Sequence, residues 1–305
     1  MEQNVSNYMM KVAKQKRKGR KNSSADMYRT VHNRLQRFPG GRTLTFGKVT
    51  KNFVDDFACN LRDEGLAVNT VNSYLSCFRA VYNSAREAGV FDDNGKSPFA
   101  HLRLRREITA KRALTSHAIN ELARIQPSAG TDTRQSLDLF LFCFMACGMP
   151  FVDLAHLTWD NIVGKEIIYH RHKTGVRVQV TITRAMRLII HRYASKNRHY
   201  LFPILPEKEC SHECYKALLA HHNASLKEIG NRLSHPVKLT SYVARHSWAT
   251  EALRQNTPVA VISQAMGHTS EKTTRIYLDS LDQSVLTKAN RKITKVVNDL
   301  ILGRA

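Results

Sequence analysis

The segment from Lys165 to Thr183 is the feature that most limits the fold, because it alternates apolar and polar residues as β-strands do. Its two halves meet at Lys173-Thr174-Gly175, where Gly175 suits the positive φ of a tight turn. We therefore expect an antiparallel β-hairpin there. Most other apolar positions recur at helical spacing. Together these patterns predict a mainly α fold with a small antiparallel β-sheet.

The apolar spacing predicts helices on both sides of this hairpin. The run from Ser136 to Met145 is almost wholly apolar, which predicts a buried helix, and Thr115 is a good N-cap for a helix through Leu122. Helices are also expected over residues 24–38, after Thr50, and over 69–89, 151–157, 184–194, 213–229 and 284–302.

The length and charge of the chain indicate two domains and a polyanionic partner. Its 305 residues, 42% of them hydrophobic, can form more than one core. Lys and Arg outnumber Asp and Glu by 47 to 25, which gives a formal charge of +22. A membrane surface is the competing polyanion, but there is no apolar run of about eighteen residues and no signal peptide. We therefore expect a cytoplasmic protein that does not bind membranes.

Changes in composition predict the domain boundaries. Residues 1–23 are rich in Lys and Arg and poor in apolar residues, so we expect a basic disordered arm; a merely solubilising tail is the alternative. A second basic run follows Pro98. The expected organisation is an arm at 1–23, a first domain at 24–100, a basic linker at 101–112, and a second domain at 113–305.

The six cysteines favour free thiols, because they are scattered through a large chain with no secretory signal. The group Cys210, His212 and Cys214 could indicate zinc. Its spacing matches no common zinc pattern, and the residues that follow are typical of an amphipathic helix. We expect neither a metal nor a cofactor.

The residues best suited to chemistry lie between Leu239 and Leu278. This stretch contains Arg245, His268 and Tyr277 within a strongly basic chain. A tyrosine hydroxyl can attack phosphorus, while cationic and N–H donors neutralise the charge that builds on the non-bridging oxygens. No metal is needed for such a reaction.

Three motifs in this stretch resemble those of the tyrosine recombinase (phage integrase) family. Arg245-His246-Ser247 resembles the family's second-arginine box, Gly267-His268 its Gly-His box, and Tyr277, nine residues after His268, its nucleophile. The resemblance implies that residues 24–100 form a helical, SAM-like core-binding domain that clamps DNA. It also implies that residues 113–305 form a mixed, predominantly helical catalytic domain.

The resemblance assigns roles within the catalytic domain. Tyr277 would form a 3′-phosphotyrosyl bond, Arg245 and His268 would stabilise the phosphate charge, and Lys173 would protonate the leaving 5′ oxygen. Tyr242 lies where the family most often has histidine, three residues before Arg245. Tyrosine keeps a hydrogen-bonding hydroxyl but loses the near-neutral titration, which favours an auxiliary phosphate contact.

Further residues are expected to contact DNA, and the resemblance also implies partners. The expected partners are double-stranded DNA, a homotetramer formed on it through the C-terminal helix in trans, and accessory DNA-bending proteins. Arg79 would serve equally well as a solvated residue on a helix face. The expected DNA-binding residues are Lys111, Arg112, Arg79, Thr70 and Asn72.

One family residue is absent. Phe151-Val152-Asp153-Leu154 resembles the first-arginine box, but the arginine's place is taken by Pro150, or by Cys147 in a variant of the motif. Loss of one oxyanion donor commonly slows a reaction about a hundredfold to a thousandfold. Arg134, at the head of the expected helix that ends just before Cys147, is a hypothetical substitute for this arginine.

These patterns predict a site-specific DNA recombinase of the integrase or invertase type. A DNA-binding protein that has lost catalysis is one alternative, supported by the missing arginine. A type IB topoisomerase is the other, because the same nucleophile and clamp can nick and reseal one strand.

The net charge predicts a strong dependence of DNA affinity on salt. A protein that neutralises six to ten phosphates should lose about 10³- to 10⁵-fold in affinity between 50 and 200 mM salt. Titration of labelled duplex DNA at several salt concentrations measures the slope, and an affinity insensitive to salt would contradict the prediction.

Overall fold

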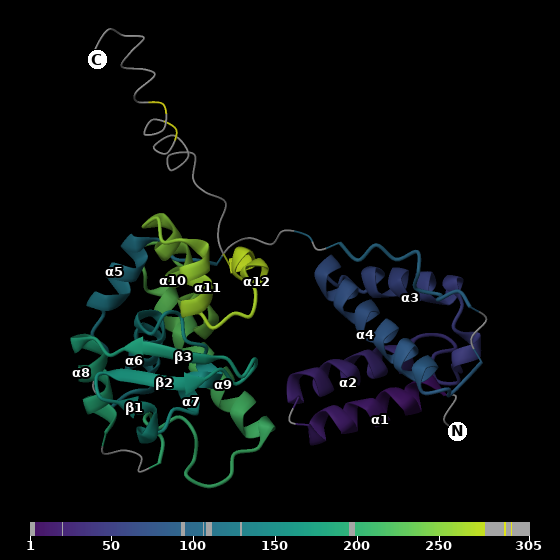
Figure 1. Ribbon diagram of the computed structural model, residues 1–305, viewed down its shortest axis with the longest axis horizontal. Coiled ribbons are helices and arrows are strands. Elements are labelled where there is room, and N and C mark those ends of the chain that lie inside the picture. The colour runs from purple at the N-terminus through teal and green to yellow at the C-terminus, as the bar shows by residue number, and fades with distance from the viewer. Residues whose placement is uncertain are drawn as a thin grey trace. The chain divides into compact units, whose positions relative to one another are not determined.

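The computed structural model describes residues 4–19, 21–92, 95–105, 107, 112–128, 130–194, 199–277, 290 and 294 (Figure 1). The side chains of Ile276 and Tyr277 are not part of that description. The chain divides into two compact units, Met1–Thr109 and Ala110–Ala305. Each has its own hydrophobic core. No helix in the described ranges is long and apolar enough to cross a bilayer.

The first unit is helical. It consists of α1 (Val5–Lys18), α2 (Asn22–Arg37), the short 3₁₀ helix η1 (Phe46–Lys48), α3 (Lys51–Asp63) and α4 (Val68–Glu87). The Thr50 hydroxyl caps α3 by accepting a hydrogen bond from the Phe53 amide. Buried aromatic rings from three segments meet edge to face in the core, including Phe57, Phe78 and Phe99.

The prediction of a disordered arm is wrong for residues 5–18. They form α1, which packs against α2 and α4 (Figure 1). Val5 and Met9 are fully buried, and the Tyr8 hydroxyl donates to the Ser84 carbonyl on α4. The basic residues that suggested disorder lie mostly on the exposed side of the same helix. A few apolar residues at helical spacing were enough to fold the segment, because α2 and α4 supply the surface that covers them.

The start of the predicted linker belongs to the first unit. Leu102 and Leu104 pack against its core. The Asn72 amide donates to the Arg105 carbonyl at 2.7 Å, and the Asn69 side chain both donates to and accepts from the Glu107 backbone. The division between the units therefore falls after this docked segment, between Thr109 and Ala110.

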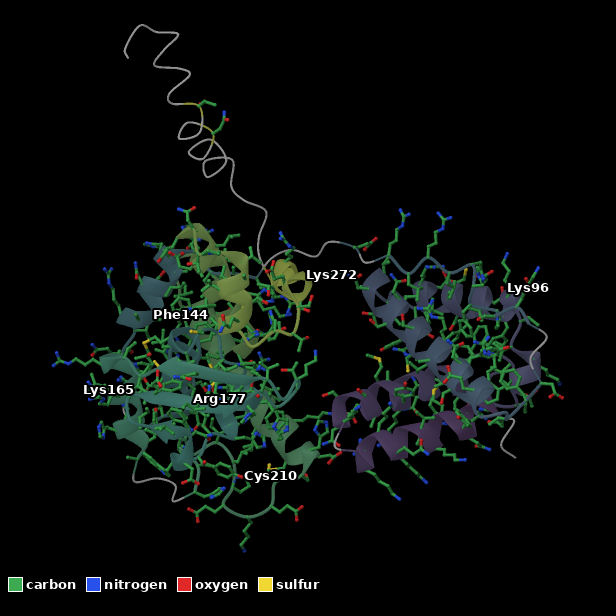
Figure 2. The ribbon with its side chains drawn as sticks, in the orientation of Figure 1. Lys96, Phe144, Lys165, Arg177, Cys210 and Lys272 are labelled. Carbon is green, nitrogen blue, oxygen red and sulfur yellow. The ribbon has the colours of Figure 1, made fainter. Side chains whose placement is uncertain are left out.

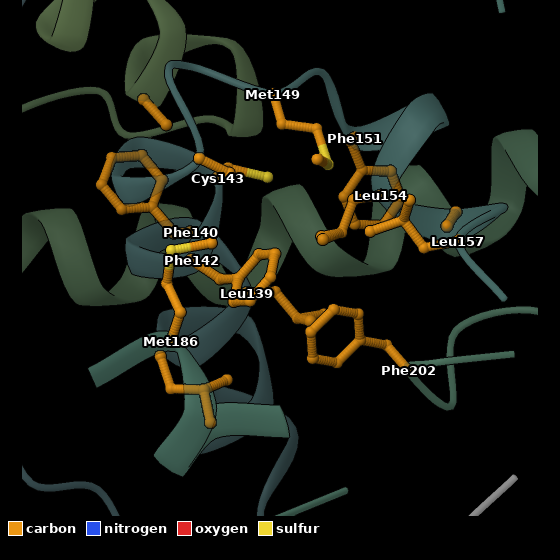
Figure 3. Close-up of a cluster of buried hydrophobic side chains, with 14 of the residues drawn as sticks. Leu139, Phe140, Phe142, Cys143, Met149, Phe151, Leu154, Leu157, Met186 and Phe202 are labelled. Atoms are coloured by element: carbon orange, nitrogen blue, oxygen red, sulfur yellow. The ribbon is translucent and has the colours of Figure 1, made fainter. Parts of the chain in front are cut away.

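The second unit is a helical layer around one small sheet. Its helices are α5 (Ser116–Arg124), α6 (Asp132–Met145), α7 (Phe151–Ala155), η2 (Trp159–Asn161), α8 (Arg184–Tyr193), α9 (His212–Asn231), α10 (Ser241–Arg254), α11 (Val259–Ala265) and α12 (Glu271–Tyr277). The apolar helix α6 lies at the centre of its core. Phe140, Phe142 and Cys143 of α6 lie in one cluster with Met149, Met186 and Phe202 from other segments (Figure 3).

The sheet confirms the expected fold class. Strands β1 (Ile162–Val163), β2 (Glu166–His170) and β3 (Arg177–Thr181) pair antiparallel in the order β1-β2-β3. The inward positions of the hairpin carry Ile167, Tyr169, Val178 and Val180, all buried. Arg177 begins β3 just after the turn (Figure 2). The protein is thus mainly helical with a small antiparallel sheet, as predicted.

Two adjacent methionines test whether α1 is part of the folded domain. Met9 is fully buried, whereas Met10 is partly exposed. Met9→Ala should lower the free energy of unfolding by about 2 to 5 kcal/mol, because it leaves a cavity, and Met10→Ala should lower it much less. Urea unfolding of the two variants measures the difference. Equal, negligible effects would mean that the segment does not pack.

Candidate active site

Arg245 is the centre of the site. It lies on α10 with 1% of its surface exposed. Its Nη1 donates to the Gly148 carbonyl at 2.7 Å, and its Nη2 donates to the Met266 carbonyl at 2.7 Å. Nη2 also lies 2.7 Å from His268 Nε2. The guanidinium therefore joins two segments that are far apart in sequence: the turn after α6, and the end of α11 with the Gly-His motif that directly follows it.

Two glycines permit this close packing. A Cβ on Gly148, at φ +69°, would lie 2.9 Å from the Cα of Arg245. A Cβ on Gly267, at φ +63°, would lie 2.6 Å from Val178 Cγ2 and 2.8 Å from Arg171 Cγ on the hairpin. Larger residues would push the hairpin or α10 away, so both positions require glycine for space as well as for backbone conformation.

His268 is a neutral hydrogen-bond acceptor in this geometry. An arginine only donates, so the contact with Arg245 requires a lone pair on His268 Nε2. The proton is then on Nδ1, which donates to the buried Thr274 hydroxyl at 2.8 Å. Burial, and then the charges of Arg245, Arg171 and Lys173, lower the pKa of His268 to about 4. Before His268 can donate to an anion, Nε2 must gain a proton.

The β2–β3 hairpin brings Lys173 to the same region. Lys173 is exposed at the turn, and its charge is felt at His268. The turn is closed by hydrogen bonds from the Arg171 amide to Val176 and from the Gly175 amide to Arg171. The Thr174 hydroxyl lies 3.5 Å from the Gly267 carbonyl. An exposed lysine on a tethered turn can reach outward to a bound ligand.

Arg171 is a site residue to which the sequence assigned no role. It is 7% exposed, its Nε donates to Asp153 Oδ2 at 2.6 Å, and its Nη1 donates to the Met266 carbonyl. Asp153 also accepts from the His172 amide at 2.7 Å. One signal could have identified Arg171. It continues the inward series of Ile167 and Tyr169, where a charged residue is unexpected.

Two of the predicted site residues have positions that do not test their assigned roles. Tyr277 ends α12, and its side chain lies outside the described part of the chain. Tyr242 lies on the first turn of α10, is 43% exposed, and packs edge to face against His246. The roles of Tyr277 as nucleophile and Tyr242 as phosphate ligand stay predictions.

The predicted DNA-binding residues fall on both units. Arg79 and Thr70 are partly exposed on α4, and Arg112 is exposed. Lys111 and the expected C-terminal helix at 284–302 lie outside the described residues, apart from the single positions 290 and 294. Asn72 has a structural partner, because its amide holds the Arg105 carbonyl.

The two positions where the family's first arginine is missing, Cys147 and Pro150, lie in the turn between α6 and α7. Cys147 adopts φ +56° beside Arg245, whose positive charge lowers the pKa of the thiol while burial raises it more strongly. Pro150 is the N-cap of α7. The hypothesis that Arg134 substitutes for the missing arginine is wrong, because Arg134 is held by Asp138 and the Pro127 carbonyl. It lies in the first turn of α6, about 16 Å along the axis from the end at Met145.

Comparison with known proteins identifies the family. Residues 112–284 match the model of the phage integrase family, and residues 4–100 match that of the phage integrase SAM-like domain. The chain therefore belongs to the phage integrase family, as its motifs predicted. The integrase of Escherichia phage P2 is 22% identical over 231 residues, a match that covers 75% of this chain and 61% of the phage protein. The chain thus matches less than two thirds of that relative's length.

Solved structures share the fold. The Tn1549 transposon integrase in complex with transposon right end DNA has a TM-score of 0.63 at 16% identity and covers 94% of this chain and 99% of its own. A lambda integrase dimer bound to a COC′ core site has a TM-score of 0.65 at 16% identity, covering 90% of this chain and 76% of its own. XerH recombinase bound to difH scores 0.61 at 17% identity, with coverage of 93% and 84%.

The neutral state of His268 predicts how stability depends on pH. Because its pKa is about 4 in the folded protein and about 6.5 ordinarily, the unfolded chain binds more protons between these values. His268 thus contributes stability that is present above pH 6.5 and is lost as the pH falls toward 4. His222, buried against the Phe151 ring, has a pKa lowered to about 4 and acts in the same direction.

His268→Gln should therefore reduce the loss of unfolding free energy between pH 6.5 and 4. Glutamine can still accept from Arg245 and donate to Thr274, so the change removes the titration and keeps the contacts. Urea unfolding at a series of pH values measures the slope. His222→Gln is the matched comparison and should reduce the slope in the same sense. A slope unchanged by both substitutions would contradict the prediction.

Proposed function

We propose that this protein is a site-specific DNA recombinase of the integrase or invertase type. The observation that carries the proposal is the hydrogen bond between the buried Arg245 and the half-buried His268, next to a hairpin lysine, in a chain of the phage integrase family. Such a group of donors suits an attacked phosphodiester, whose non-bridging oxygens gain charge in the transition state. The proposed partner is double-stranded DNA.

The proposed reaction begins with attack of the Tyr277 hydroxyl oxygen on phosphorus. The bond from phosphorus to the 5′ oxygen breaks, and the 3′ phosphate remains joined to Tyr277. Lys173 would protonate the leaving 5′ oxygen, and the proton that the Tyr277 hydroxyl releases would balance the one that Lys173 donates. The later attack of a 5′ hydroxyl on the phosphotyrosine would reverse these steps and join the new strand. The covalent bond conserves the phosphodiester energy, so rejoining needs no nucleotide cofactor.

Arg245 and His268 would act on the non-bridging oxygens. Arg245 is oriented by two backbone carbonyls, so little reorganisation is needed when the charge develops. A phosphate placed beside His268 would raise its pKa and favour the protonated, donating imidazole. The neutral state expected without phosphate would therefore change on binding.

The assembly proposed for this reaction is a tetramer on DNA. Each protomer would dock its C-terminal helix on a neighbour, and accessory DNA-bending proteins could assist. Four copies would bring two duplexes together for strand exchange. A cytoplasmic location is part of the same proposal, because the substrate is DNA.

A binding protein without catalysis is the second candidate. It is favoured by one observation, the absence of arginine at both Cys147 and Pro150. A third candidate is a type IB topoisomerase. It can be distinguished with a supercoiled plasmid that lacks the target site, because only a topoisomerase would relax that plasmid. The plasmid carrying the site would be recombined by a recombinase and unchanged by a binding protein.

The role of Tyr277 can be tested by covalent capture. The substrate is a nicked duplex that carries the inverted repeat found by sequencing the DNA around the gene; cleavage next to the nick releases a short fragment and traps the protein. Tyr277→Phe should abolish capture and leave DNA affinity unchanged, because only the attacking oxygen is lost. Denaturing gels measure the trapped complex.

The control for this experiment is Tyr200→Phe, at a tyrosine of the catalytic unit outside the site. It should be captured like the parent. Capture of the Tyr277→Phe variant would refute the assignment of the nucleophile.

A further inference from the structure

Arg171 has contacts that a merely structural arginine on a β-hairpin does not need. It lies at the hairpin's first turn position, two residues before Lys173, and is 7% exposed. Its Nη1 donates to the Met266 carbonyl, which also accepts from Arg245 Nη2. The two guanidinium groups thus converge on one oxygen, and the two donating nitrogens lie within two hydrogen-bond lengths of each other.

Two like charges held this close repel each other, and the repulsion is relieved when an anion binds between them. Asp153 neutralises Arg171 from one side through Nε. Among the described residues, Arg171 donates to Asp153 through Nε and to the Met266 carbonyl through Nη1, which uses two of its five N–H groups. The remaining N–H groups of Arg171 can donate to a second acceptor such as a phosphate oxygen. The positive charge of Arg171 also reaches His268, together with those of Arg245 and Lys173.

The turn after α6 supplies no guanidinium to this place. Cys147 lies beside Arg245 with a thiol, and Pro150 has no side-chain donor. The hairpin packs closely against Gly267, which has no side chain to keep Arg171 away. A long side chain from the hairpin can therefore occupy the neighbourhood that an arginine from the turn would otherwise fill.

We propose that Arg171 is the second phosphate-binding guanidinium of the site, supplied by the hairpin in place of the arginine that the turn after α6 lacks. The proposal rests on the proposed function, because it assigns Arg171 to a non-bridging oxygen of the phosphate attacked by Tyr277. The competing role is positioning alone, in which Arg171 only fixes the Met266 carbonyl and thereby His268. If Arg171 binds the phosphate, the effect of replacing Arg171 on the cleavage rate should depend on the charge of the phosphate. If Arg171 only positions other groups, the effect should not depend on that charge.

The first experiment varies that charge. A methylphosphonate at the scissile position replaces one non-bridging oxygen with an uncharged methyl group, so the transition state needs less cationic stabilisation. Arg171→Gln is combined with Asp153→Asn, because removing the arginine alone would leave a buried carboxylate unpaired. Single-turnover cleavage of the nicked inverted-repeat duplex is measured with both substrates, against Asp153→Asn alone.

On the phosphate substrate, the double variant should cleave about a hundredfold to a thousandfold more slowly than Asp153→Asn. On the methylphosphonate substrate, the cleavage rates of these two variants should differ by less than about tenfold. Equal losses on both substrates would overturn the proposal and leave Arg171 a positioning residue, and no loss on either would also overturn it. The matched control is Arg192→Gln. Arg192 lies on α8, outside the site, and also pairs with a carboxylate, that of Asp138 at 2.5 Å. The Arg192→Gln variant should cleave DNA at the parental rate.

A second variant covers the case in which the double variant does not fold. Arg171→Lys keeps a positive charge for Asp153, but one ammonium cannot hold Asp153, Met266 and a phosphate in the same geometry. It should cleave about a hundredfold more slowly, and Cys147→Arg should restore the rate by supplying a guanidinium from the turn. Cys147→Arg alone should gain little, because the place is already served. A parental rate for Arg171→Lys, or no rescue, would overturn the proposal.

The proposed function is tested separately by the parent. Capture of the parent protein, abolished by Tyr277→Phe, establishes covalent cleavage whatever Arg171 does. If the parent is not captured, the proposed function fails. If the parent is captured and the Arg171 variants behave like their controls, only this further inference fails.

Discussion

The burial of the Arg245 guanidinium is the constraint on which the catalytic unit depends. A buried cation is costly unless hydrogen bonds offset its desolvation, and here two backbone carbonyls and an imidazole accept from the two terminal nitrogens of Arg245. Those acceptors come from the turn after α6 and from the end of α11. The packing of α10, α6 and α11 is thus tied to one side chain. Any change that moves one of these segments also moves the proposed phosphate donor.

A second buried charge links the sheet to the same centre. Asp153 on α7 receives both the Arg171 side chain and the His172 amide, so a single carboxylate fixes where the hairpin turn begins. Buried ion pairs contribute little net stability, because desolvation offsets the attraction. We therefore attribute the pair to orientation, since it sets the hairpin that carries Lys173. The contact of Arg171 with Met266 then joins the hairpin to Arg245.

The N-terminal unit shows how tertiary contacts can reverse a conclusion from composition. The basic residues of α1 lie mostly on its solvent side, while Val5 and Met9 on the other side are fully buried. Counted along the sequence, the charges dominate and indicate disorder. Arranged on a helix, they leave an apolar face that α2 and α4 cover. The same helix can therefore fold into the domain and present positive charge to solvent.

The sequence by itself determined the family, the fold class, the hairpin and most helices. These follow from local periodicity, from caps such as Thr50, and from the spacing of Arg245, His268 and Tyr277, all of which are written along the chain. Only the tertiary structure decided that Arg171 donates to the same Met266 carbonyl as Arg245, that Arg134 lies at the far end of α6, and that His268 is neutral. Those outcomes depend on which distant backbone oxygens and side chains surround each group. Sequence spacing cannot encode such contacts, because residues 95 positions apart, such as Arg171 and Met266, meet only when the whole unit has folded.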